Sequence, residues 1–305
     1  MNLSTRRSRA GLVFSLAIAC NLLYQLLVSV LVLAFHIQLE FDFTAFLLVQ
    51  TFLPIVVAGG VLLFAGKRGG ATLPSVFSLR KPGTWDLQVG IVLGVAVCFS
   101  SGFLNELFSR ALNEIGIHNG LNLPAAPNTF GLVLFCFVLC VLPAISEELV
   151  FRGAITSYLS AEKTSTVCLI SGALFALMHM NLAQMLNAFL VGMFLTLITL
   201  RTGSIFPAMA IHFVNNLTTV LAENIFSGRG LPVLFWDFTL FEVIAAAVCL
   251  IPIGLALWRY LKRPTRAALE PLAGHMPAGT AKDFWLSALP GLIFAGVFTL
   301  LTLLS

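Results

Sequence analysis

Residues 131–144 read GLVLFCFVLCVLPA and carry no charge, and they are followed directly by ISEELVFRGA at residues 145–154. An apolar run of about 18 or more residues spans a bilayer as an α-helix, and the run around residues 131–144 is long enough to do so. Two adjacent carboxylates, Glu147 and Glu148, therefore lie in a stretch that otherwise has the composition of a membrane span. Ionisable groups in such positions are costly and usually mark a functional site.

The composition of the whole chain indicates an integral membrane protein. Of its 305 residues, 59% are hydrophobic and only 10% are charged, whereas about a quarter of the residues of a typical soluble domain are charged. Long apolar runs occur at residues 11–35, 43–65, 88–108, 130–157, 165–181, 183–200, 204–224, 237–258 and 284–304. Because the runs at 165–181 and 183–200 are short and nearly continuous, we predict eight or nine spans.

These runs also predict the fold class. Backbone groups inside lipid must pair within the protein, and the runs are too long for the strands of a barrel. We therefore expect an all-α, polytopic transmembrane helical bundle. No soluble appendage is evident, so we assign residues 1–305 to a single integral membrane domain.

The basic residues predict the orientation in the membrane. The net charge is +4, and the basic residues cluster at Arg6, Arg7 and Arg9, at Lys67, Arg68, Arg80 and Lys81, and at Arg259, Lys262, Arg263 and Arg266. With nine spans and a cytoplasmic N-terminus, all three clusters lie on the cytoplasmic side, as the positive-inside rule requires. No basic stripe interleaves with aromatic residues, so we expect no binding of nucleic acid.

The two adjacent glutamates are predicted to have different roles. Residues four apart share a helix face, so Glu148 lies next to Arg152, with the acid on the favourable N-terminal side. Glu147 points about 100° away and is left without that partner. A carboxylate near hydrocarbon can serve as a general base, although a charged cluster at the membrane interface is the simpler alternative.

Two further apolar helices carry polar groups at the same spacing. His179 lies four residues after Phe175, and His212 lies four residues before Asn216. Taken singly, His179 is a satisfied core histidine as readily as a functional one. Likewise, His212 with Asn216 is as readily a polar clamp between helices. A carboxylate, two histidines and an asparagine on three separate spans together favour a site.

The three motifs in this order are similar to those of one family. Glu-Glu-x-x-x-Arg, Phe-x-x-x-His and His-x-x-x-Asn resemble the CAAX-protease and bacteriocin-processing (Abi) intramembrane proteases. The matching residues are Glu147, Glu148, Arg152, Phe175, His179, His212 and Asn216. The resemblance covers residues 130–225, which we treat as the catalytic core helices. It implies hydrolysis of a peptide bond within the membrane, with a peptide or a membrane protein as substrate.

The resemblance also implies a role for each residue. Glu147 and His179 would activate a water molecule, and His212 and Asn216 would donate hydrogen bonds to the oxyanion. The supporting residues would be Glu148, Arg152 and Phe175. Bacterial members of the family favour the bacterial inner membrane as the location, with the N-terminus in the cytoplasm.

Several alternatives remain open from the sequence. No cofactor is favoured, but Glu147, His179 and His212 could hold zinc as a set of two histidines and one glutamate. Against zinc, the helical His-Glu-x-x-His spacing is absent. Ser146 lacks the companion motifs of serine catalysis. Two rival functions remain. One is a non-catalytic bacteriocin-immunity or scaffold protein of the same fold, and the other is a proton-coupled transporter.

Overall fold

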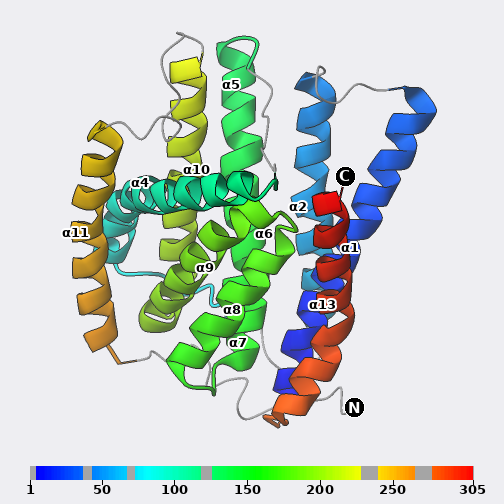
Figure 1. The fold of residues 1–305 in the computed structure, drawn as a ribbon. Helices are drawn as coiled ribbons and strands as arrows, with labels where there is room; N and C mark the ends of the chain where they lie inside the picture. Colours follow the sequence, from blue (N-terminus) through cyan, green and yellow to red (C-terminus); the bar gives the residue numbers. More distant parts are fainter. Residues whose placement is uncertain are drawn as a thin grey trace.

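The computed structural model describes residues 5–36, 43–66, 73–117, 126–227, 240–264 and 277–304, and all secondary structure in these residues is helical (Figure 1). The all-α expectation is therefore confirmed. The helices before the central segment are α1 (Arg6–Phe35), α2 (Phe43–Gly66), α3 (Leu73–Val76) and α4 (Thr84–Glu114). The helices after it are α8 (Thr164–Met178), α9 (Leu182–Thr202), α10 (Phe206–Ser227), α11 (Leu240–Lys262) and α13 (Ala281–Leu304).

The central segment is one long helical run with two wider turns. It comprises α5 (Thr129–Cys136), the π-helix η1 (Phe137–Val141), α6 (Leu142–Glu148), the π-helix η2 (Leu149–Ile155) and α7 (Thr156–Leu159). π-Helical turns inside an α-helix frequently occur at functional sites. Here they flank the short α6 segment that ends in Glu147 and Glu148.

Within the residues that the structure describes, nine helical segments coincide with the nine predicted apolar runs. Seven of those in the described part of the chain are long and apolar enough to cross a membrane, which makes the protein a polytopic membrane protein. The 15-residue helix α8 is shorter, because its length of about 22 Å falls short of a hydrocarbon layer about 30 Å thick. Helix α10 is 22 residues long but carries several polar residues.

One end of the bundle gathers basic residues from distant parts of the chain. Helix α1 begins and α11 ends at the lower end of the view in Figure 1. There Arg7 donates through Nε to Glu162 at 2.7 Å, and Arg201 donates through Nη1 to the carbonyl of Arg263 at 2.6 Å. Two of the basic clusters therefore lie at the same end, as the predicted orientation requires.

Close packing of α8 against α9 depends on glycine. A Cβ atom placed on Gly192 would lie 3.0 Å from Cα of Gly172 and 3.2 Å from the ring of Phe175. Helix α4 packs against α9, α10 and α11 and crosses the middle of the view in Figure 1, while α10 and α11 stand upright. The α6 segment itself packs against α2 and α10, and the following π-helix η2 packs against α8 and α9.

Candidate active site

Pro143 opens the central helix toward α10. Proline has no N–H, so the carbonyl of Leu139, four residues earlier, receives no hydrogen bond from position 143. Instead, Leu142 donates its N–H to Phe137 in a π-turn, and Asn216 donates through Nδ2 to the Leu139 carbonyl at 3.1 Å. The π-turn therefore lies just before Pro143, and the Leu139 carbonyl holds Asn216 of α10 against the central helix.

Glu148 joins two motifs rather than one. Its Oε1 accepts from Nη1 of Arg152 at 2.8 Å and from Nδ1 of His212 at 2.9 Å. The side chains of Glu148 and Arg152 are completely buried. The sequence predicts the pairing of Glu148 with Arg152, but it gives no sign of the contact with His212, since α6 and α10 meet only in the fold.

Phe175 lies at the centre of the three motifs. Its ring faces the Arg152 guanidinium at 4.3 Å, and its centroid lies 4.8 Å from the His179 ring and 6.1 Å from the His212 ring. Both histidines meet it nearly edge-on, at 81° and 86°. A cation over an aromatic face is stabilising, the more so when both groups are desolvated, so Phe175 helps to fix Arg152 and both imidazoles.

His179 occupies the C-terminal cap of α8, directly before the turn into α9. Its Nδ1 lies 2.8 Å from the carbonyl of Phe175. A carbonyl can only accept, so Nδ1 carries the hydrogen and Nε2 presents a lone pair in the neutral ring. Glu147 and His179 line the same two cavities.

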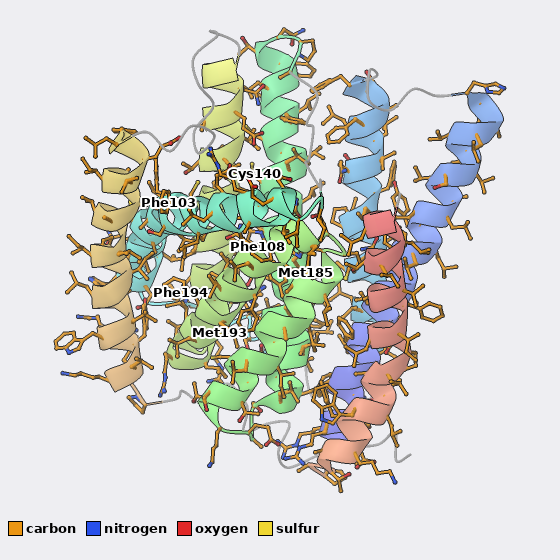
Figure 2. The ribbon with its side chains drawn as sticks, in the orientation of Figure 1. Phe103, Phe108, Cys140, Met185, Met193 and Phe194 are labelled. Atoms are coloured by element: carbon orange, nitrogen blue, oxygen red, sulfur yellow. The ribbon has the colours of Figure 1, made fainter. Side chains whose placement is uncertain are left out.

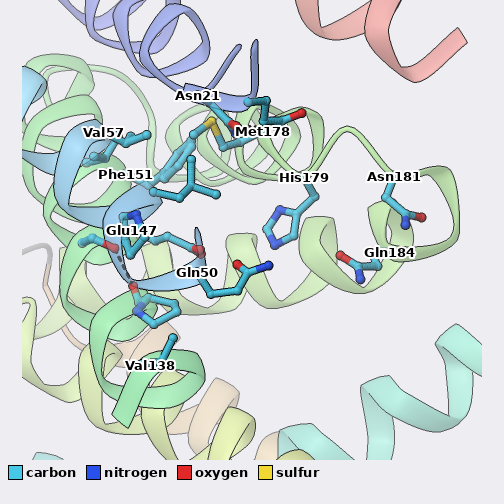
Figure 3. Close-up of a pocket in the computed structure, with 16 residues that line it drawn as sticks. Asn21, Gln50, Val57, Val138, Glu147, Phe151, Met178, His179, Asn181 and Gln184 are labelled. Carbon is cyan, nitrogen blue, oxygen red and sulfur yellow. Dashed lines mark hydrogen bonds between the residues drawn. The ribbon is translucent and has the colours of Figure 1, made fainter. Parts of the chain in front are cut away.

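Two cavities meet at Glu147 and His179. The first, which we call the α2 cavity, has a volume of about 390 Å³ and is lined among others by Asn21, Gln25, Gln50, Glu147, His179 and Gln184. The second, which we call the α10 cavity, has a volume of about 450 Å³ and is lined among others by Asn105, Glu147, His179, Asn187, Asn216 and Glu223. Figure 3 shows Glu147, Gln50 and His179 in the α2 cavity.

Glu147 is the more accessible of the two adjacent carboxylates. Its side chain is 30% exposed, and its Oε2 is buried without a hydrogen-bond partner in the described structure. This oxygen lies 3.9 Å from Nε2 of His212. By contrast, Glu148 is fully buried and is not among the residues that line the two cavities; its Oε2 also lacks a partner, but its Oε1 accepts from two donors. The two glutamates therefore differ in exposure, and Glu148 pairs with Arg152 as the helix geometry predicts.

Within the described part of the chain, no three side chains of His, Cys, Asp or Glu converge as a group that could hold a metal ion. The alternative set of Glu147, His179 and His212 therefore has no converged ligand geometry there. Nδ1 of His212 is also taken by Glu148, which leaves only its Nε2 toward Glu147.

Sequence reasoning missed the amide-bearing walls of both cavities. Asn21, Gln25 and Gln50 come from α1 and α2, and Asn105 comes from α4. The ionisable residues of the three motifs follow a regular spacing of four residues, whereas the uncharged amides in the spans follow no motif spacing. Their occurrence within apolar helices is the signal that could have pointed to them, because amides in spans are otherwise costly.

Comparison with protein families finds one match. Residues 129–218 match the type II CAAX prenyl endopeptidase Rce1-like family. These residues form a Rce1-like domain. The match confirms the family resemblance inferred from the motifs, and it covers α5 through the first half of α10. No curated protein and no solved structure matches the chain.

The Rce1-like domain does not complete the cavities alone. It contains all seven motif residues, from Glu147 to Asn216. The residues Asn21, Gln50, Asn105 and Glu223, which line the two cavities, lie outside it. The family belongs to the proteases, so the domain supports peptide hydrolysis in general. Residues of the surrounding helices complete the lining of the two cavities.

Proposed function

We propose that the protein is an intramembrane endopeptidase that hydrolyses a peptide bond with water activated by Glu147 and His179. One observation carries the proposal. The unpartnered Oε2 of Glu147 and the bare Nε2 of His179 belong to side chains that line the same two cavities within the Rce1-like domain. Two acceptors at one site suit a water molecule, which has two hydrogens to donate.

Glu147 takes the proton as the water attacks the scissile carbonyl. His179 holds the water through Nε2, because its Nδ1–H is committed to the Phe175 carbonyl. A positioned general base contributes about 10²–10⁴-fold to a rate. Glu147 then passes the proton to the leaving amine, which completes hydrolysis with no net change in the side chains.

His212 and Asn216 stabilise the oxyanion. The amide of Asn216 has two N–H groups, and one is taken by the Leu139 carbonyl, so the second is available. The Nδ1–H of His212 points to Glu148. Nε2 is therefore the ring atom of His212 that is left to face the oxyanion, and it donates when it carries a hydrogen. Donors fixed before the reaction lower the barrier without reorganisation.

We also infer the placement in the membrane. The basic residues of α1, the α9 terminus and the α11 terminus lie at one end of the bundle, which supports a cytoplasmic N-terminus. We propose a bacterial inner membrane and assign the catalytic core to residues 130–225, within a single domain of residues 1–305. Peptides or membrane proteins within the bilayer are the proposed substrates.

The test compares the purified wild type with Glu147→Gln in the same detergent. Metal content and cleavage of a library of internally quenched apolar peptides are measured on each sample, before and after chelation. We expect chelated wild type to cleave, and Glu147→Gln to remain folded by circular dichroism but lose at least about 100-fold in rate.

Three results would contradict the proposal. Full activity in Glu147→Gln would mean that another group is the base. Stoichiometric zinc lost together with activity would move Glu147, His179 and His212 to ligand roles. A folded wild type that cleaves no peptide of the library would favour the non-catalytic immunity or scaffold function.

A further inference from the structure

The α10 cavity differs from the α2 cavity in carrying a second carboxylate, Glu223. We propose that this cavity binds a positively charged nitrogen group of the substrate, namely a lysine or arginine side chain, through Glu223. The inference rests on the proposed function and adds a substrate class to it: membrane-embedded segments with a basic residue near the scissile bond.

Glu223 lies on the same face of α10 as the proposed oxyanion donors. The lining positions His212, Asn216, Thr219 and Glu223 follow one another at spacings of four, three and four residues, which places them on one face of a helix. Glu223 is seven residues beyond Asn216, a distance of about 10 Å along the axis. An extended peptide covers that distance in about three residues.

The opposite walls of the α10 cavity present further acceptors. Asn105 of α4 and Asn187 of α9 line it, and the Oδ1 atom of each is buried without a hydrogen-bond partner in the described structure. Figure 2 shows the part of α4 between Phe103 and Phe108, which contains Asn105, crossing the middle of the bundle. A buried acceptor without a donor is costly. A ligand that brings several N–H groups removes this cost.

The charge of the cavities selects the sign of the ligand. Among the described residues that line either cavity, none is lysine or arginine, whereas Glu147 and Glu223 are acidic. Arg152 is close to the site but is buried and paired with Glu148. An ammonium or guanidinium carries only donors and a positive charge, so it matches Glu223 and the two asparagines.

The same charges disfavour another kind of substrate. One such substrate is a peptide that is cut close to its C-terminus, so that the leaving group ends in a free carboxylate. In the described cavities such a carboxylate meets acidic groups and buried carbonyl oxygens. Like charges in a poorly solvated site repel strongly. Cleavage at an internal bond near a basic residue fits this chain better.

The experiment uses the full chain in phosphatidylcholine vesicles and a matched set of quenched fluorescent peptides. The peptides are acetylated and amidated, share one apolar core, and carry Lys, Gln or Glu at one to five residues on either side of the scissile bond. We expect the lysine peptide to exceed the glutamine peptide at least about tenfold in kcat/KM, with lysine about three residues away on one side. The glutamate peptide should be the poorest substrate.

Substitutions assign the preference to Glu223. Glu223→Gln should remove the difference between lysine and glutamine peptides, and Glu223→Lys should make the glutamate peptide the best of the three. Glu114→Gln is the matched control, because Glu114 is exposed at the end of α4, and it should keep the lysine preference. A lysine preference that persists in Glu223→Gln would overturn the assignment.

Binding to Glu147→Gln separates this inference from the proposed function. Labelled lysine and glutamine peptides are titrated onto this variant, whose binding does not depend on turnover. Tighter binding of the lysine peptide without any cleavage by wild type would support the cation site and contradict the protease. Equal binding of both peptides would overturn the cation site. Peptides with a free N-terminus distinguish a terminal ammonium from a side chain as the bound group.

Discussion

Oε1 of Glu148 lies 2.9 Å from Nδ1 of His212, and the two residues are 64 positions apart in the chain. The same oxygen accepts from Arg152 at 2.8 Å. One carboxylate oxygen therefore orients a histidine of α10 and neutralises a completely buried guanidinium of the central helix. Glu148 couples the first motif to the third, and removing it affects both the fold and the proposed oxyanion donors.

We predict that Glu148→Ala destabilises the protein by about 3–5 kcal/mol, because Arg152 is left as a buried charge without its partner. Activity falls as well, since His212 loses the acceptor that orients it. The measurement is thermal unfolding in detergent beside kcat/KM on any cleaved peptide. Glu148→Gln keeps an acceptor oxygen in the same place and should lose less stability.

The matched control is Glu106→Ala. Glu106 pairs with Arg110 at 2.8 Å with the same spacing of four residues, but this pair is exposed. An exposed pair contributes at most about 1 kcal/mol. Equal losses from the buried and the exposed substitution would contradict the role given to Glu148.

Pro143→Ala is predicted to lower activity without lowering stability. The new N–H at position 143 can donate to the Leu139 carbonyl, which now accepts from Asn216, and it thereby releases the Asn216 amide. Because alanine allows a regular helical hydrogen bond at this position, the unfolding temperature of the variant should stay the same or rise. Pro252→Ala in α11 serves as the control, because Pro252 also lies inside a helix but lines neither cavity.

Asn216→Ala is predicted to reduce kcat by about 10²–10³-fold with little change in KM, as expected for a donor that acts in the transition state. Steady-state kinetics on a cleaved peptide measure the split between the two constants. Thr218→Ala on the same helix is the control, since its hydroxyl donates to the Val214 carbonyl. A change confined to KM would assign Asn216 to substrate binding instead.

Gly192→Ala is predicted to lower the free energy of unfolding by about 1–3 kcal/mol. The new Cβ atom would lie too close to Gly172 and Phe175 and would push α9 away from α8. The shift also moves the Gly192 carbonyl, which accepts from Nη2 of Arg152 at 3.3 Å. Thermal unfolding measures the loss. Gly254→Ala in α11 meets no atom within 4 Å and should be neutral or stabilising by up to about 1 kcal/mol. A neutral Gly192→Ala would show that the helices adjust freely.

The helical class and the candidate residues could be predicted from the sequence because both depend on local chemistry. A run such as residues 131–144 has no stable alternative to a helix in lipid, and spacing by four residues places Glu148 beside Arg152 whatever the rest of the chain does. Charge in an apolar span singled out Glu147, His179 and His212. The number of membrane spans was harder to predict from the sequence, because α8 is shorter than a typical span and its length alone does not show whether it crosses the membrane.

The tertiary structure alone decided how the motifs meet. The contact of Glu148 with His212 and the capture of the Leu139 carbonyl by Asn216 join separate helices, and no spacing along one helix encodes them. The same is true of the depth of His179 and of the walls formed by Asn105, Asn187 and Glu223. Sequence periodicity specifies which residues share a face of each helix. The distances between helices, on which the chemistry depends, are set by close packing, such as that of Gly172 against Gly192.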